Sequence, residues 1–255
     1  MISKLSSVSE NSKLGKNLSI DAFSIIHENV EIGDNCWIGS NVTILPGARI
    51  GNNCKIFPGA VISGAPQDLK FKEGNTLTII NDNTIIRECV TINRGTKETN
   101  ETIIGSNCFI MAYCHIAHDC KIGSNCILAN AVNIAGHVTI ENDVTIGGMT
   151  AIKQFTNIGE HSMISGGSLV RKDIPPYIKV AKEPLKFLGI NIVGLKRKNF
   201  SEKDIKIIKN MYREIFGNGK NLTDALKSIT EKELKTKEKN IIDFIKKSKQ
   251  GIVKN

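Results

Sequence analysis

The sequence predicts a mainly β protein, in which a parallel β-helix is followed by a C-terminal α-helical domain. Between Leu14 and Val170 an aliphatic side chain returns at every sixth position, with 24 matches in one phase. The residue two positions earlier is small or β-branched, and a glycine often follows the aliphatic directly. After Asp173 this period ends and lysine-rich segments with helical spacing begin. We therefore expect the β-helix to cover residues 1–174 and the helical domain residues 175–255.

The period of six is what predicts the coil. It matches no α-helix, which turns once in about 3.6 residues, but it matches a short strand followed by a corner, because strand side chains alternate with period two. Three such units close a triangular coil of 18 residues. One coil cannot cover its own interior, so coils stack on one another. We expect the corner glycines to supply both backbone freedom and close approach between coils.

Two stretches leave this period and predict loops on the solenoid. The first, residues 63–79, contains Pro66 and Gly74, and the second covers residues 94–102. Loops carried by a rigid scaffold often hold functional residues.

The C-terminal segment has the spacing of helices. We expect a short helix over residues 184–199, and then a helix that is N-capped by Ser201 and runs to about Phe216. Two further helices are expected over about 222–235 and 238–249. A helical domain at this place would cap the open end of the β-helix, which otherwise invites edge pairing.

The charge is distributed unevenly along the chain. Residues 1–170 hold 12 basic and 15 acidic side chains, whereas residues 171–255 hold 22 and 10. A basic surface of this kind suits an acidic partner or phosphate groups, although a solvated helical face gives the same composition.

Composition also predicts the cellular location of the protein and the state of its cysteines. No run of 18 apolar residues occurs, so we expect no membrane span, and the first residues lack the apolar core of a signal peptide. A cytoplasmic location is therefore expected. Six of the seven cysteines occupy the small inward slot, which indicates buried reduced thiols and not a zinc site or a disulfide framework.

A cluster of histidines is the strongest candidate for chemistry. Three of the five histidines lie within 23 positions, namely His115, His118 and His137. Residues 18 apart stack on neighbouring coils, so His118 should share a corner position with Gly136 and Gln154, and Asp119 the next position with His137. An imidazole beside a carboxylate is a general-base arrangement, and a glycine amide can stabilise an oxyanion. The spacing alone leaves a zinc site open.

Longer motifs carry a resemblance to a known family. The six-residue repeat resembles that of hexapeptide-repeat proteins, whose β-helix is left-handed, and this resemblance decides the hand that the spacing leaves open. The whole chain resembles the acyl-ACP–UDP-N-acetylglucosamine O-acyltransferases of lipid A biosynthesis. The motifs that carry this resemblance are Gly64-Ala-Pro-Gln-Asp-Leu-Lys, Arg87-Glu-Cys-Val-Thr-Ile-Asn-Arg-Gly-Thr, His115-Ile-Ala-His-Asp-Cys, Ile146-Gly-Gly-Met-Thr-Ala-Ile-Lys-Gln-Phe and Asn191-Ile-Val-Gly-Leu-Lys-Arg.

The resemblance implies a reaction and roles for its residues. It implies transfer of an (R)-3-hydroxyacyl chain from acyl carrier protein to the 3-hydroxyl of UDP-N-acetylglucosamine, the first step of lipid A biosynthesis. It assigns His118 as general base, Asp119 as the group that orients and balances it, and the Gly136 amide as oxyanion donor. It implies no metal and no cofactor apart from the phosphopantetheine on the carrier protein.

The resemblance also implies substrate contacts and partners. The implied substrate-binding residues are Asp68 and Lys70 at the glucosamine, His115, His137 and Gln154 at the sugar and diphosphate, and Asn191 and Arg197 at the nucleotide phosphates or the pantetheine arm. Gly166 matches the position that measures acyl length, where a glycine leaves a longer groove. A homotrimer with active sites between subunits is implied, with acyl carrier protein docked on the basic C-terminal segment and no nucleic acid partner.

Several alternatives stay open at this point. Asn93 and Lys153 stand where some family members have histidine, so a 3-amino sugar remains a possible acceptor. A coenzyme A-dependent acetyltransferase, a zinc-dependent hydratase and a solenoid that only binds partners are the other functions that the repeat allows.

Overall fold

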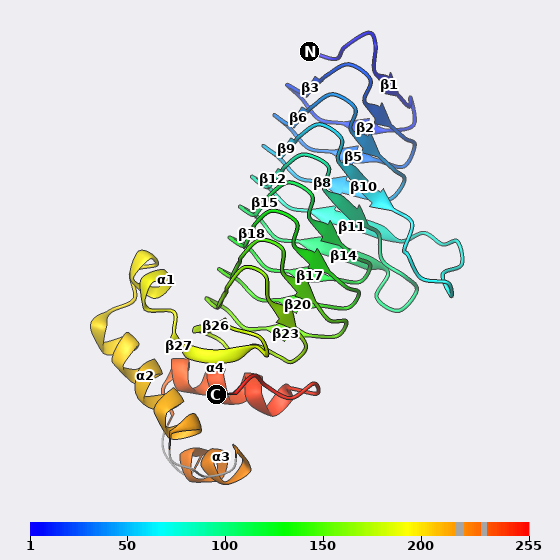
Figure 1. The fold of residues 1–255 in the computed structure, drawn as a ribbon. Helices are drawn as coiled ribbons and strands as arrows, with labels where there is room; N and C mark the ends of the chain where they lie inside the picture. The colour runs from blue at the N-terminus through cyan, green and yellow to red at the C-terminus, as the bar shows by residue number, and fades with distance from the viewer. Residues whose placement is uncertain (218–221, 231–233, 255) are drawn as a thin grey trace.

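The computed structural model of the chain describes residues 1–217, 222–230 and 234–254. Figure 1 shows the coils stacked one below another from the N-terminus, with the C-terminal helices gathered at the far end. The predicted fold class is confirmed, since the molecule is a left-handed parallel β-helix followed by a helical end.

Short strands form the three flat faces of the β-helix, and from β1 to β25 consecutive strands belong to successive faces. The first face contains β1 (Ser7–Val8), β4 (Ile25–Ile26), β7 (Thr43–Ile44), β10 (Val61–Gly64), β13 (Thr91–Asn93), β16 (His115–Ile116), β19 (Asn133–Ile134), β22 (Ala151–Ile152) and β25 (Leu169–Val170). The second face contains β2 (Lys13–Leu14), β5 (Glu31–Ile32), β8 (Ala48–Ile50), β11 (Leu77–Ile80), β14 (Glu101–Ile104), β17 (Lys121–Ile122), β20 (Thr139–Ile140) and β23 (Asn157–Ile158). The third face contains β3 (Ser19–Ile20), β6 (Trp37–Ile38), β9 (Lys55–Ile56), β12 (Ile85–Ile86), β15 (Phe109–Ile110), β18 (Ile127–Leu128), β21 (Thr145–Ile146), β24 (Met163–Ile164), β26 (Ile178–Ala181) and β27 (Lys186–Ile190).

The aliphatic ladder forms the core of the coil. Neighbouring strands of a face pair in parallel and in register, so that Ile116 lies opposite Ile134 and His115 opposite Asn133. The second residue of nearly every strand points inward and is buried, whereas the first points outward. This alternation is the reason why one six-residue period specifies both the core and the exposed faces.

The corners use asparagine where backbone freedom is needed, so the expected role of glycine there is partly wrong. The residue three positions after the inward aliphatic adopts positive φ, for example Asn35 at 58° and Asn53 at 57°. Asparagine tolerates this left-handed conformation better than most residues. The glycines that follow the aliphatics have the other expected role: a Cβ on Gly105 would lie 2.5 Å from the Gly123 carbonyl carbon on the next coil.

The burial predicted for six of the cysteines is confirmed. All seven are free thiols, six of them buried, and only Cys89 is exposed. Within the described residues, no helix is both long and apolar enough to cross a bilayer.

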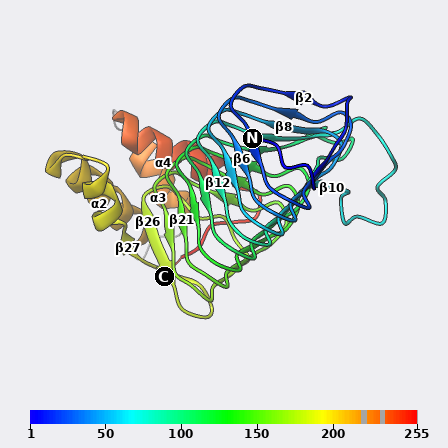
Figure 2. The same cartoon turned by 90° about the horizontal axis from the view of Figure 1, so that it is seen from above.

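Both loops leave the solenoid at the same edge, the corner between the first and second faces. One joins β10, which ends at Gly64, to β11, which begins at Leu77. The other joins β13 to β14 over residues 94–100. Figure 2 shows the longer loop projecting beyond the outline of the stacked coils. This edge is also the one where His118 follows β16.

The helix expected over 184–199 is wrong for its first half. Residues Lys186–Ile190 form β27, which runs antiparallel to β26 and extends the third face. Gly189 has a φ of 103°, which no α-helix accepts, and the open edge of β26 offers backbone partners. Only Ile192–Arg197 is helical, as α1.

The remaining helices follow the prediction with shifted ends. Helix α2 (Glu202–Phe216) begins at Ser201, whose Oγ accepts a hydrogen bond from the Asp204 amide, so the predicted N-cap is confirmed. Helix α3 covers Leu222–Thr230, and residues 231–233 of its expected extension lie outside the described residues. Helix α4 covers Thr236–Lys247 and packs near the last coils (Figure 1). The domain boundary at residue 174 stays a prediction.

Candidate active site

The candidate site lies on the corner between the first and second faces, just below the two loops. Asp119 and His137 occupy the left-handed corner position on consecutive coils, with φ of 61° and 59°. The His137 amide donates to the His118 carbonyl oxygen at 3.1 Å, which keeps the two coils in register. The 18-residue repeat therefore places three chemically active side chains side by side.

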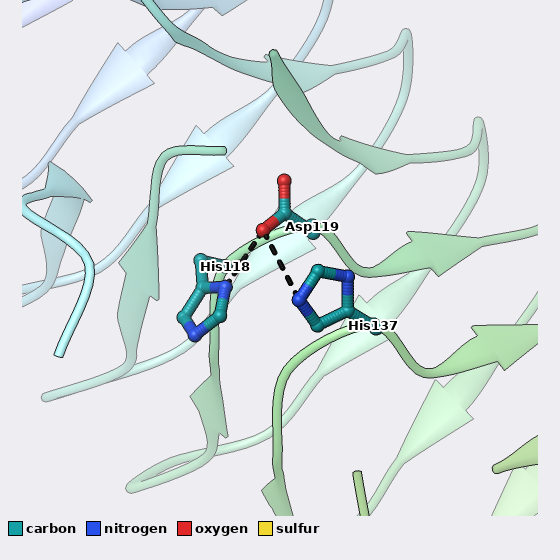
Figure 3. Close-up of side chains that lie close together, drawn as sticks. All are labelled: His118, Asp119 and His137. Atoms are coloured by element: carbon teal, nitrogen blue, oxygen red, sulfur yellow. Dashed lines mark hydrogen bonds and ion pairs between the residues drawn. The ribbon is translucent and has the colours of Figure 1, made fainter. Parts of the chain in front are cut away.

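His118 and Asp119 form a buried pair. The His118 Nδ1–H donates to Asp119 Oδ2 at 2.7 Å, and the side chains are only 9% and 0% exposed. Because an ionised carboxylate can only accept, this bond assigns the proton to Nδ1 and leaves the lone pair on Nε2. Figure 3 shows the rings of His118 and His137 turned toward the same oxygen of Asp119.

Gly136 supports the His118 ring from the next coil. A Cβ built on Gly136 would lie 2.7 Å from His118 Cε1 and 3.0 Å from Nε2. Only glycine therefore lets the imidazole lie flat against this backbone. Among the described residues, none accepts a hydrogen bond from the Gly136 amide.

The loop between β13 and β14 surrounds the Asp119 carboxylate with donors. The Thr96 amide donates to Oδ1 at 2.9 Å and the Thr96 hydroxyl to Oδ2 at 2.8 Å. The Thr99 hydroxyl donates to Oδ1 as well. Burial by itself would raise the pKa of Asp119, but the bonds from Thr99, His118 and Thr96 together hold that pKa below its usual value. Asp119 therefore stays ionised at neutral pH.

His137 completes the cluster from the coil below. Its Nε2 lies 3.6 Å from Asp119 Oδ2 and 3.5 Å from Glu98 Oε2. Its ring stacks on Phe155 at a centroid distance of 4.7 Å and meets the His118 ring edge-on at 5.2 Å. The stacking fixes the orientation of the His137 ring.

His115 lies beside this cluster on the first face. Its Nδ1 is 2.8 Å from the hydroxyl oxygen of Thr91 on β13. Burial lowers the pKa of His115, and the neighbouring charge of His118 lowers it further. A neutral His115 can therefore donate or accept a hydrogen bond without adding charge to the site.

The longer loop brings Asp68 and Lys70 to the same edge. They line a shallow cavity of about 170 Å³ together with Thr96, Lys97 and Glu98 of the shorter loop. Asp68 Oδ1 accepts from the Lys70 amide at 2.9 Å, which leaves Oδ2 and the lysine ammonium available. Because Glu98 contacts His137, this cavity adjoins the histidine cluster.

This arrangement can carry out proton abstraction. An imidazole whose Nδ1 is bonded to a carboxylate, with the backbone of a glycine packed against the ring, is an arrangement that suits acyl transfer. The same side chains could also hold a metal ion, because ligand atoms of His118, Asp119 and His137 all lie within 4.8 Å of one another.

Known proteins with this fold and sequence point to one family. The curated acyl-[acyl-carrier-protein]–UDP-N-acetylglucosamine O-acyltransferase of Sulfurihydrogenibium is 50% identical over 247 residues, which cover 96% of this chain and 91% of the relative. The chain belongs to this O-acyltransferase family. The corresponding protein of Sulfurovum is 43% identical over 96% of this chain and 94% of its own.

Family models and a solved structure agree with this assignment. A model described as UDP-N-acetylglucosamine O-acyltransferase, domain 2, matches residues 173–253. A bacterial hexapeptide-transferase model matches residues 30–64 and 101–136. The crystal structure of the UDP-N-acetylglucosamine acyltransferase from Bacteroides fragilis superposes with a TM-score of 0.96 at 44% identity, covering 99% of this chain and all of that one.

Not all predicted site residues of this O-acyltransferase meet within one chain. Gln154 is exposed one coil below Gly136, on the same edge. Asn191 caps α1 through the Gly194 amide and donates to the His161 carbonyl oxygen at 2.9 Å, which places it at the corner between the second and third faces. Arg197, exposed at the end of α1, lies on that side as well. One chain therefore does not bring Asn191 or Arg197 to His118.

Gly166 lies at the remaining corner of this O-acyltransferase. It precedes β25 on the edge between the third and first faces and is exposed. The first face, which carries His115, Asn133 and Ala151 outward, separates it from the corner of His118.

The residues that sequence reasoning missed are Thr96, Glu98 and Thr99. All three belong to the stretch that breaks the six-residue period before Ile104. This break in the period lies one coil before the histidine motif. It was the signal that could have indicated these residues, because a loop that leaves a corner can fold back over the next coil. Its threonines are the donors that the buried Asp119 requires.

Proposed function

We propose that this protein transfers an (R)-3-hydroxyacyl chain from acyl carrier protein to the 3-hydroxyl of UDP-N-acetylglucosamine, the first step of lipid A biosynthesis. The single observation that carries the proposal is the buried His118–Asp119 pair lying against the Gly136 backbone. Membership of the O-acyltransferase family supports the choice of donor and acceptor.

His118 would act as the general base. Its Nε2 takes the proton of the sugar hydroxyl while the oxygen attacks the thioester carbonyl, and the Gly136 amide donates to the oxyanion that forms. When the tetrahedral intermediate collapses, the C–S bond breaks and the imidazolium returns the proton to the leaving thiolate. Asp119 keeps the ring oriented and stabilises its charge, because its carboxylate stays ionised. We expect neither a metal nor a resident cofactor to take part in this reaction.

The acceptor would lie along the edge that carries both loops. Asp68 and Lys70 project from the adjoining cavity and suit the hydroxyls of a glucosamine ring. His115 and His137 lie near the base, and Gln154 is exposed on the same edge; these three residues would contact the sugar and the diphosphate. Asn191 and Arg197 would reach the phosphates or the pantetheine arm from a neighbouring subunit, since one chain places them at another corner.

The acyl chain would cross the first face from His118 to Gly166. The outward side chains between these corners are Asn133, Ala151 and Leu169, and Leu169 is 40% exposed. A small, partly apolar track of this kind suits an alkyl chain, and the absence of a side chain on Gly166 leaves its far end open.

A homotrimer would cover the apolar edge between the third and first faces. Phe23, Tyr113 and Met149 occupy its left-handed corner positions and are 62%, 67% and 77% exposed. Large aromatic and thioether side chains repeated along one edge indicate an interface and not a solvated surface. Closing this edge about a threefold axis would bring each active site against a neighbouring chain.

Acyl carrier protein would dock on the basic C-terminal segment. Residues 171–255 hold 22 basic and 10 acidic side chains. Complementary charge of this size speeds association with an acidic partner and weakens with salt.

A defined assay tests the proposal. The purified protein is incubated with UDP-N-acetylglucosamine and a series of 3-hydroxyacyl carrier proteins, and the products are identified by mass spectrometry. We expect a 3-O-acyl product that is lost in His118→Ala, whereas Tm stays unchanged. Activity with acetyl coenzyme A alone, or full activity in His118→Ala, would overturn the proposal.

A further inference from the structure

We infer that His118, Asp119, His137 and Glu98 form a binding site for a divalent transition-metal ion, zinc above all, and that metal bound there inhibits the enzyme. The site itself depends on the positions of His118, Asp119 and His137, whose ligand atoms lie within 4.8 Å of one another. Glu98 adjoins this group through its 3.5 Å contact with His137. Its inhibitory effect rests on the function proposed above, in which His118 is the base.

Three distances between the proposed ligand atoms can be compared with those of a zinc site. His137 Nε2 lies 3.6 Å from Asp119 Oδ2 and 3.5 Å from Glu98 Oε2. Nitrogen and oxygen ligands at about 2.0–2.2 Å in a tetrahedron lie about 3.4 Å from one another. Only the 2.7 Å contact between His118 Nδ1 and Asp119 Oδ2 is shorter, because a proton now joins these atoms. Replacing that proton by a metal ion requires this pair to separate by roughly 0.7 Å.

The donor set matches zinc in kind and in charge. Two imidazoles and two carboxylates are common zinc ligands, and the two negative charges balance those of the ion. The imidazoles are only 13% and 9% exposed, so the ion would be held away from bulk water. Glu98, which is 73% exposed, is the one ligand that must move in from the surface.

The groups that orient the ligands are also in place. Thr96 and Thr99 hold the Asp119 carboxylate through three hydrogen bonds, and Phe155 stacks on the His137 ring. Supporting contacts of this kind fix ligand direction and typically change metal affinity by about 10- to 100-fold. The corner is therefore preorganised in the same way as a metal site.

Metal at Nδ1 would remove the base. The bound nitrogen gives its lone pair to the ion, so the single proton of the neutral His118 ring must move to Nε2. This nitrogen lies beside Gly136 and would then donate instead of accepting the sugar proton.

Metal binding is measured on the trimer-competent full chain without any assay of activity. The exposed thiol is first removed by Cys89→Ser, since it could bind zinc independently. Zinc is titrated calorimetrically, and cobalt is followed by the visible bands of a tetrahedral ion. We expect one ion per chain, an affinity about tenfold weaker in Glu98→Gln, and loss of the site in His137→Gln. His27→Gln, a histidine on the same edge but four coils away, serves as the matched control.

The inhibition arm compares each variant with its own metal-free rate. Zinc should inhibit acyl transfer reversibly, a chelator should restore the rate, and Glu98→Gln should raise the inhibitory concentration about as much as it weakens binding. Unchanged stoichiometry in His137→Gln, or equal affinity in Glu98→Gln, would overturn the inference. Glu98 is exposed, so its variant tests the site even if His137→Gln fails to fold. Metal binding without any acyl transfer would count against the proposed function alone, whereas acyl transfer without metal binding would count against the site alone.

Discussion

Substituting Gly136 by alanine should disable the base while leaving the fold intact. The added Cβ would lie 2.7 Å from His118 Cε1 and 3.0 Å from Nε2, whereas carbon atoms in contact prefer about 3.5–4.0 Å. The ring must therefore move by about 0.8 Å or more. The backbone of Gly136 does not have positive φ, so alanine adds no conformational strain of its own.

This displacement can be converted into an expected rate. A shift of about 0.8 Å would stretch the 2.7 Å bond between His118 and Asp119 beyond the range of about 2.7–3.2 Å in which such bonds remain strong. Misplacement by about 1 Å can cost about 100-fold, and complete loss of a general base costs about 10²–10⁴ in rate. We therefore expect kcat to fall by about 100-fold or more in Gly136→Ala, which corresponds to about 2.7 kcal/mol.

A double-mutant cycle separates this mechanism from general damage. Turnover is measured with saturating donor and acceptor for Gly136→Ala, His118→Ala and the double variant. If alanine acts through the His118 ring, it should cost little once that ring is absent. Additive losses, or a Gly136→Ala enzyme with more than about a third of the parental kcat, would refute the reasoning.

Four further predictions concern ionisation, core and assembly. Thr99→Val should raise the pKa of Asp119, because it removes a hydrogen bond that favours the charged carboxylate; carboxyl NMR titration measures it. Burial lowers the pKa of His161, so the unfolded chain binds its proton more tightly and the fold loses stability as pH falls below about 6.5. His161→Gln should therefore lose less Tm between about pH 7 and 5 than the parent. Ile116→Ala should cost about 2–5 kcal/mol in urea unfolding, since this side chain is fully buried. Met149→Glu should dissociate the proposed trimer in sedimentation equilibrium, because it places charge on the apolar edge.

Three of these predictions have a matched control. Thr43→Val, on the first face but away from the loops, should leave the pKa of Asp119 unchanged. Ile25→Ala, 42% exposed in the single chain, should cost far less than the buried substitution. Lys121→Glu on the outward side of the second face should leave the assembly intact. An unaltered Asp119 titration in Thr99→Val, or a steeper loss of Tm in His161→Gln, would contradict the two ionisation predictions. Equal stability costs for the two isoleucine substitutions would contradict the core prediction. A Met149→Glu protein that stays assembled would contradict the trimer prediction.

The sequence predicted the coil well because the coil is periodic. One inward aliphatic in six positions fixes the strand, its register and its face at once, and Ile116 indeed lies opposite Ile134. The same arithmetic placed His118, Asp119 and His137 on adjacent coils, where the structure brings them together. Periodicity therefore predicts which residues lie next to each other on neighbouring coils, but it does not predict the loops or the C-terminal segment.

The misses lie where the period does not apply. Thr96 and Thr99 reach Asp119 through a loop whose path no repeat describes. Residues 186–190 form a strand because they pair with the open edge of β26. This pairing is a tertiary interaction, which local sequence preference does not reveal. The left-handed corner is more often asparagine than glycine, although Gly47, Gly59 and Gly167 also occupy it. The pattern counted the glycine next to the aliphatic and overlooked the position two residues later.

The shared corner from which both loops emerge also determines what length changes the protein can accept. A residue added inside a coil would rotate every later side chain by one slot and turn its aliphatics toward water. Residues added between Gly64 and Leu77, or between Asn93 and Glu101, leave that count untouched, because the chain re-enters the next coil at a fixed point. Changes of length are thus confined to the two loops beside the candidate active site. Engineering of acceptor preference should begin with these two segments.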